Sequence, residues 1–192
     1  MEIILATTSP YRIQAFRFLG IDFMAEGSRV DESQVGRNEP EDLVRELSRL
    51  KAEAVAKNHK NVIVIGMDSV GYFDNKILEK PKSKEEGLER LKALSGKSHQ
   101  FYTGIHVVNT AANKAISEII KTEIHLRSFS DKEVEIYLEQ DKFYNTYALG
   151  YDPLEHYSST FAEKIEGSYN NFLRGIPLEI MPNLIKRAMQ LK

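Results

Sequence analysis

A nearly unbroken apolar run in the first half of the chain constrains the fold more than any other feature. Residues 61–66 read Asn-Val-Ile-Val-Ile-Gly, and β-branched side chains favour a strand. A strand that is apolar on both faces is typical of the middle of a sheet covered by helices on both sides. The run therefore predicts an α/β protein with a central sheet.

The rest of the chain mixes strand and helix patterns around this run. Strands are predicted at 2–7, 101–109 and 115–127, the last two antiparallel, and a hairpin at 73–77. Helices are predicted at 10–19, 41–57, 83–94, 130–139 and from about residue 177, where Pro182 should kink the helix or break its start. Residues 141–176 are predicted to be loops and short strands. This pattern indicates a mixed α/β protein with two lobes around a shared sheet.

Composition narrows the function classes. A chain of 192 residues suits one domain, spanning residues 1–192, and its net charge of −2 argues against a general nucleic-acid binder. The absence of cysteine excludes disulfides, thiolate metal sites and a cysteine nucleophile. No apolar stretch is long enough for a signal peptide or a membrane span, so we expect a cytoplasmic protein with no membrane partner.

The first helix has the composition of an anion-binding site. Ser9 suits the N-cap, Pro10 suits the first helical position, and Arg12 then falls in the first turn. A cation in that turn opposes the helix dipole, so stability alone would favour an acidic residue. Free N–H groups, a hydroxyl and a guanidinium would converge there on an anion. The plainer alternative is that Arg12 points to solvent.

Two carboxylates and two lysines could complete such a site. Asp68 comes directly after the apolar run, where ligands of α/β sheets collect, and Glu32 follows an apolar Val30. These two carboxylates would suffice for Mg²⁺ bound together with substrate phosphates. Lys51 and Lys80 could form a cationic cradle for a polyphosphate with Arg12. Taken singly, Asp68 also suits a turn, and the other charged residues suit a solvated surface.

Several common catalytic motifs are missing. The five histidines show no metal-ligand spacing, and a single histidine such as His99 near a strand is more often structural than catalytic. The chain has no Gly-x-x-x-x-Gly-Lys loop, no Gly-x-Gly-x-x-Gly after a strand and no Gly-x-Ser-x-Gly elbow. These absences disfavour P-loop, Rossmann and α/β-hydrolase chemistry.

Seven motifs nevertheless follow one another in a specific order. They are Ala-Thr-Thr-Ser9-Pro-Tyr-Arg12, Val-Asp-Glu32, Ser-Arg-Leu-Lys51-Ala, Gly-Met-Asp68-Ser, Glu-Lys80-Pro, Leu-Ser-Gly-Lys-Ser-His99 with Thr103-Gly104, and Glu-Gly-Ser-Tyr-Asn with Gly-Ile-Pro-Leu. Their order and spacing, from Ile3 to Leu178, resemble the Maf family of nucleotide pyrophosphatases.

The resemblance implies a fold and an activity. Maf proteins have a long mixed, twisted sheet flanked by helices, with an active-site cleft between two lobes, and they often form homodimers. They hydrolyse a nucleoside triphosphate to the monophosphate and pyrophosphate with Mg²⁺ or another divalent cation such as Mn²⁺. The expected substrate is therefore a free nucleotide, not a nucleic-acid polymer.

The resemblance also implies roles for individual residues. Ser9, Arg12, Lys51 and Lys80 would grip the phosphates. Glu32 and Asp68 would organise the metal and the attacking water, with Asp68 as proton acceptor. We expect Asp68, Glu32, Lys51 and Lys80 to form the catalytic set.

Three positions depart from the family pattern. Tyr11 stands where a second arginine is common, Ser69 replaces threonine, and Gly150 replaces a glutamine. The family ties these positions to the choice of base, so we predict that Tyr11, Ser69 and Gly150 contact substrate here with an altered preference. A preference for thymidine or uridine nucleotides does not transfer.

Two alternatives stay open on the sequence. One is an inosine/xanthosine triphosphate pyrophosphatase, whose family has a related fold and a similar N-terminal turn. The other is a non-catalytic nucleotide-binding or cell-division regulatory protein, suggested by Tyr11 and Gly150.

Overall fold

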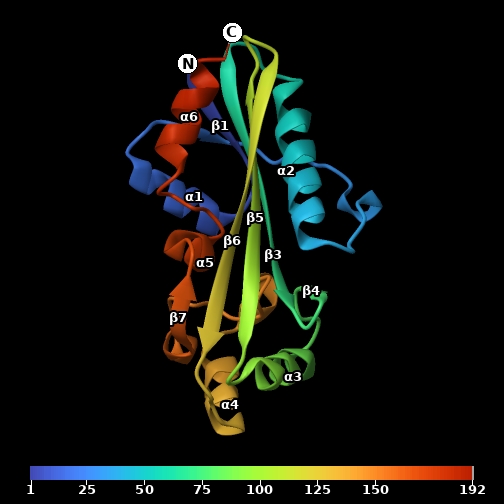
Figure 1. Ribbon diagram of the computed structural model, residues 1–192, viewed down its shortest axis with the longest axis vertical. Coiled ribbons are helices and arrows are strands. Elements are labelled where there is room, and N and C mark those ends of the chain that lie inside the picture. Colours follow the sequence, from blue (N-terminus) through green and yellow to red (C-terminus); the bar gives the residue numbers. More distant parts are fainter. Residues whose placement is uncertain (192) are drawn as a thin grey trace.

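A mixed seven-stranded sheet runs through the whole molecule (Figure 1). The computed structural model describes residues 1–191. The strands follow the spatial order β2-β1-β3-β5-β6-β7, with β4 paired to β3. Strand β1 is parallel to β2 and β3, and the other pairs are antiparallel. The strands are β1 (Glu2–Ala6), β2 (Met24–Ala25), β3 (Val62–Phe73), β4 (Lys76–Leu78), β5 (Ser98–Asn109), β6 (Lys114–Leu126) and β7 (Ala162–Glu166).

Helices cover both faces of the sheet around β3, as the apolar run predicts. In Figure 1, α2 lies along one side of the long strands, and α1 and α6 lie on the other. Side chains from Val62 to Ile65 are accordingly buried. The helices are α1 (Pro10–Phe16), α2 (Pro40–Ala56), α3 (Lys84–Leu94), α4 (Asp131–Gln140), α5 (Tyr169–Arg174) and α6 (Met181–Met189), with the short 3-10 segments η1 (Arg17–Leu19), η2 (Glu32–Gln34), η3 (Tyr144–Thr146) and η4 (Tyr157–Thr160).

Separate apolar clusters give the molecule its two lobes. One lobe packs β1, α1 and α6 around residues such as Phe16, Ile65 and Ile185. The other packs α3, α4 and α5 around residues such as Leu91 and Tyr137. The long strands β3 and β5 contribute side chains to both. The expectation of a long mixed sheet flanked by helices is confirmed.

Two glycines let α2 lie unusually close to the sheet. A Cβ at Gly104 of β5 would overlap the backbone of Val44 in α2. A Cβ at Gly66 of β3 would lie 2.6 Å from the backbone nitrogen of Ala52, also in α2. Contacts this short do not occur for real side chains, so only glycine permits this helix–sheet approach.

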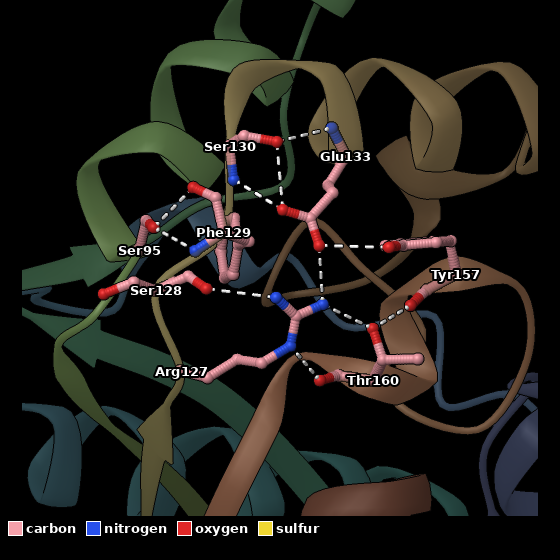
Figure 2. Close-up of polar contacts among 8 residues, drawn as sticks. All are labelled: Ser95, Arg127, Ser128, Phe129, Ser130, Glu133, Tyr157 and Thr160. Carbon is pink, nitrogen blue, oxygen red and sulfur yellow. Dashed lines mark hydrogen bonds and ion pairs between the residues drawn. The ribbon is translucent and has the colours of Figure 1, made fainter.

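A polar network holds α4 against the rest of the second lobe, which is the lobe built from α3, α4 and α5 (Figure 2). Arg127 pairs with Glu133 at 2.9 Å and donates to the carbonyl of Thr160 at 2.8 Å. Glu133 also accepts from the backbone nitrogen of Ser130 and from the hydroxyl of Tyr157. With Ser130 it forms the reciprocal capping box that the sequence predicts for this helix. Together these bonds hold the start of α4 against the end of β6 and η4.

Several local predictions need correction or refinement. The hairpin forms, with Asp74 and Asn75 both at positive φ. The helix predicted from about residue 177 begins only at Met181, with Pro182 in its first turn, so the predicted broken start is observed and the kink is not. Within 141–176, where only loops and short strands are predicted, residues 169–174 form α5, capped by Ser168. A helix this short has little periodic pattern to detect.

The described part of the chain contains no helix with the length and apolarity needed to span a membrane. The expected domain ends at residue 192, which lies outside the described residues.

Candidate active site

A lysine ammonium joins the two carboxylates that the sequence singles out. Lys51 Nζ lies 2.5 Å from Asp68 Oδ1 and 2.9 Å from Glu32 Oε1. The side chains of Lys51 and Asp68 are only 14% and 13% exposed, whereas Glu32 is 43% exposed. Three residues distant in sequence thus form one charged cluster, open to solvent on the Glu32 side.

Each member of this cluster is placed by its own element. Lys51 lies on α2, and the close approach at Gly66 and Gly104 brings that helix against β3, which carries Asp68. Glu32 is the first residue of η2, whose N-cap Asp31 accepts a hydrogen bond from the backbone nitrogen of Ser33 at 3.0 Å. The geometry of the site therefore depends on the packing of α2 and on a capped turn.

Asp68 does not come after the end of its strand, as the sequence suggested. It lies inside β3, paired with Gly104 of β5. The neighbouring strand β1, however, ends at Ala6, which pairs with Gly66. Asp68 therefore lies two positions beyond the carboxyl end of β1. Ligands of α/β sheets collect at the carboxyl ends of strands, and here the relevant strand is β1, not β3.

Arg12 is fixed by the protein and does not point freely to solvent. Its Nη2 donates to Ser69 Oγ at 2.7 Å, its Nη1 to the carbonyl of Met67 at 3.1 Å, and its Nε to the carbonyl of Gly175 at 3.1 Å. Ser69 in turn lies 2.6 Å from the hydroxyl of Thr103. These bonds join the start of α1, β3 and the end of α5 beside Asp68.

Two opposing effects act on the pKa of the Arg12 guanidinium. Burial lowers the pKa of its guanidinium, while the negative charges of Asp68 and Glu32 act in the opposite direction. With an ordinary pKa near 12.5, the group stays cationic at neutral pH. Arg12 is therefore a preorganised positive charge next to two carboxylates.

Ser9 has the predicted capping role. Its side chain accepts from the backbone nitrogen of Arg12 at 3.4 Å, and its own backbone nitrogen donates to Thr7 Oγ1 at 3.1 Å. Both the cap and the proline at the helix start are confirmed. Contact of Ser9 with a phosphate stays a prediction.

Among the described residues, no hydrogen bond or ion pair joins Lys80 or Gly150 to this cluster. Lys80 is exposed after β4 and, among the described residues, forms no ion pair. Gly150 adopts φ +80°, and a Cβ there would lie 3.1 Å from Pro81, the residue after Lys80. The loop of Gly150 therefore packs against the segment that carries Lys80. Contact of either residue with the substrate stays a prediction.

Tyr11 belongs to an aromatic cluster at the start of α1. Its ring centroid lies 5.4 Å from that of Tyr147, and its hydroxyl lies 3.4 Å from Thr146 Oγ1. Burial and the neighbouring Tyr11 raise the pKa of Tyr147. Arg174 adds a guanidinium 5.8 Å from the Tyr11 ring centroid. The sequence did not single out Arg174, although it precedes the Gly-Ile-Pro-Leu motif directly.

A cavity adjoins the charged cluster. It has a volume of about 760 Å³ and lies between the end of β1, the segment 26–32 and α2. Glu32, Lys51, Thr7 and Thr8 are among its lining residues. A cavity of this size can hold a ligand as large as a nucleotide.

The donor set near Lys51 fits a hard divalent cation bound together with a substrate. Glu32 and Asp68 both direct a carboxylate oxygen at the ammonium of Lys51, so their oxygens converge on one place. In residues 1–191 no group of three or more histidine, cysteine, aspartate or glutamate side chains could hold a metal alone. Mg²⁺ commonly uses one or two carboxylates and takes its other ligands from water and phosphate.

The fold and site define a mixed α/β protein with a mixed-charge cluster beside a nucleotide-sized cavity. Residues 2–188 match the family described as Maf-like protein. A dTTP/UTP pyrophosphatase from Thermotoga maritima is 38% identical over 180 residues, covering 93% of this chain and 85% of that protein. A 7-methyl-GTP pyrophosphatase from Nitrosococcus oceani is 31% identical over 186 residues, covering 97% and 92%. The chain therefore belongs to the Maf-like family.

A solved structure supports the fold independently. A HAM1 protein from Coxiella burnetii aligns with a TM-score of 0.56, covering 98% of this chain and 100% of that one, at 14% sequence identity. At this identity the likeness concerns the fold alone.

Proposed function

We propose that this protein is a nucleoside triphosphate pyrophosphatase. The observation that carries the proposal is the Glu32–Lys51–Asp68 cluster, with the fixed guanidinium of Arg12 beside it. The names of the relatives support the same activity, because they are pyrophosphatases of different nucleoside triphosphates. Family membership favours this reading over an inosine/xanthosine triphosphate pyrophosphatase.

The reaction requires attack by water on the α-phosphorus. The bond from the α-phosphorus to the oxygen bridging it to the β-phosphorus breaks, and pyrophosphate leaves. Negative charge grows on the α-phosphate oxygens and on the leaving group, so fixed cations stabilise the transition state more than the ground state. Arg12 and Lys51 are the cations that the site holds in place, and Lys80 would add a third.

Asp68 is the proposed proton acceptor. It lies inside the site with a side chain that is only 13% exposed, and Lys51 fixes its position. A carboxylate held in this way can take a proton from the attacking water. Glu32 and Asp68 would hold the divalent cation, Mg²⁺ or Mn²⁺, which when bound stabilises charge on the phosphate oxygens.

A nucleotide panel tests the proposal. Purified protein with Mg²⁺ should release pyrophosphate and a monophosphate from at least one nucleoside triphosphate. Asp68→Asn should lower kcat by about a hundredfold or more, because the proton acceptor is lost. Release of orthophosphate from the same substrates would contradict the proposal, as would full activity of Asp68→Asn.

The panel also decides between the remaining alternatives. Preference for inosine triphosphate over every other nucleotide would favour the inosine/xanthosine reading. Nucleotide-dependent thermal stabilisation without turnover of any substrate would favour a non-catalytic binding or regulatory protein.

Assembly and location are part of the proposal. We propose a homodimer, because the family resemblance implies one and because an apolar hollow of about 500 Å³ lies between η1 and α6, lined by Leu19, Ile21 and Ile185. Light scattering at several concentrations would measure the mass. A cytoplasmic location is likewise proposed, and fractionation of cells that express the protein would test it.

A further inference from the structure

Arg174 pairs with a buried carboxylate and lies near a half-buried aromatic ring. Its Nη1 is 3.2 Å from Asp152 Oδ1 and 3.5 Å from Oδ2, and the Asp152 side chain is only 3% exposed. The guanidinium carbon lies 5.8 Å from the centroid of Tyr11. Asp152 therefore fixes the orientation of the guanidinium beside Tyr11.

The opposite edge of this guanidinium keeps unused donors. All hydrogen bonds of Arg174 to residues of the described chain come from Nη1, which also reaches the carbonyl of Leu173 at 3.2 Å. Nε and Nη2 together carry three further N–H groups. The Arg174 side chain is 16% exposed, so these groups are partly withdrawn from water. A ligand that supplied an acceptor there would satisfy them.

The position of Arg174 ties it to the candidate active site. The next residue is Gly175, whose carbonyl accepts from Nε of Arg12. Tyr11, whose ring lies near the guanidinium, directly precedes Arg12. Arg12 donates to Ser69 on the phosphate side of the site. Arg174 lies beside the ring of Tyr11, which in turn contacts the ring of Tyr147. Aromatic rings beside a cationic phosphate site are suited to a nucleobase.

We propose that Arg174 is a base-recognition residue, which donates hydrogen bonds to an oxo group of the nucleobase beside Tyr11. A guanidinium can only donate, so it favours a base edge with an oxo group over the same edge with an amino group. Asp152 is a positioning residue in this arrangement. The inference rests on the proposed pyrophosphatase function and specifies its substrate class.

The experiment compares substrates that differ at one exocyclic position. UTP carries an oxo group where CTP carries an amino group, and GTP differs in the same way from 2,6-diaminopurine riboside triphosphate. Wild-type protein should favour the oxo member of at least one pair by about tenfold or more in kcat/KM. Inhibition by inorganic tripolyphosphate, which has no base, reports on the phosphate side of the site alone.

Two variants distinguish a loss of base recognition from a loss of folding. Arg174→Lys keeps the charge near Asp152 but loses the planar fork of donors. The double variant Arg174→Gln with Asp152→Asn removes both charges together and leaves no unpaired buried carboxylate. Arg127→Gln is the matched control, because Arg127 also forms an ion pair with a partly buried carboxylate but lies in the network of the second lobe.

The inference predicts that both Arg174 variants lose the oxo preference, mainly through a higher KM for the oxo nucleotide. Inhibition by tripolyphosphate should stay within about twofold of wild type, and Arg127→Gln should keep the preference. An unchanged oxo-to-amino ratio in folded Arg174 variants would overturn the inference, and so would a parallel loss of tripolyphosphate inhibition. Wild-type protein that releases no pyrophosphate from any nucleotide would instead contradict the proposed function.

Discussion

At the scale of single residues, Lys51 has two roles in the proposed site. Its ammonium stabilises two carboxylates that would otherwise repel each other. It also brings positive charge to the place where substrate phosphates would bind. The same ammonium contacts both carboxylates that would hold a divalent cation. We therefore expect metal binding and Lys51 to compete for these carboxylates.

Lys51→Met tests this competition. Removing one partner of a largely buried ion pair should lower the free energy of unfolding by about 2 kcal/mol in metal-free buffer. Mg²⁺ should then stabilise the variant more than the wild-type protein, because the carboxylates no longer have a competing ammonium. Thermal unfolding with and without Mg²⁺ measures both effects. Lys132→Met, which changes an exposed lysine on α4, is the control. Equal stabilisation of Lys51→Met and wild type by Mg²⁺ would contradict the competition.

The single residues of the site differ in how well the sequence predicts them. Ser9, Glu32, Lys51 and Asp68 could be named because their residue types and order are specific. Arg174 and Asp152 could not, because their pairing joins a loop to a short helix without any local pattern. Only the three-dimensional contact reveals that Arg174 faces Tyr11.

At the scale of elements, the contact between α2 and the sheet decides where Lys51 lies. The helix passes directly over Gly66 and Gly104, and Gly104 pairs with Asp68. The positions of Lys51 and Asp68 therefore depend on two backbone sites that carry no side chain.

Gly104→Ala should disturb stability and activity together. The added methyl group would overlap the backbone of Val44, so α2 must move away from β5. Overpacking of this kind should lower the free energy of unfolding by about 2 kcal/mol or more. Displacement of Lys51 should also lower kcat/KM by about tenfold or more. Gly36→Ala is the matched control, since nothing lies within 4 Å of a Cβ there. Full activity of Gly104→Ala would show that the site does not depend on this contact.

The elements themselves were partly predictable. Long periodic segments such as α2, α3 and α4 were expected within a few residues of their observed bounds, because amphipathic spacing identifies them. The end of β3 was not, because apolar patterning weakens after Met67 while pairing with β5 continues to Tyr72. Strand length here is set by the neighbouring strand, which the local sequence does not encode.

At the scale of the whole molecule, two lobes share three long strands but differ in their cores. The second lobe encloses His99, which is 2% exposed and lies 3.2 Å from the hydroxyl of Tyr151 through its Nε2. Burial, and to a smaller extent the nearby His125, lowers the pKa of His99 to about 4. His99 is thus neutral in the folded protein at neutral pH.

This buried histidine should make the stability of the protein depend on pH. The unfolded chain has the ordinary histidine pKa near 6.5, so between pH 6.5 and 4 it binds a proton that the folded protein does not. Stability should therefore fall as the pH drops through this window, by about 2 kcal/mol between pH 7 and pH 5. Chemical denaturation at both pH values checks this, and His99→Gln should show a smaller fall. An identical fall in His99→Gln would assign the pH dependence to other groups.

The central claim for the whole molecule is that its charged cluster directs water to the α-phosphorus of a nucleoside triphosphate. The most direct test is to let the protein hydrolyse one of its nucleotide substrates in H₂¹⁸O and to analyse the products by mass spectrometry. Attack at the α-phosphorus predicts one ¹⁸O atom in the nucleoside monophosphate and none in the pyrophosphate. Label in the pyrophosphate, or release of labelled orthophosphate, would contradict it.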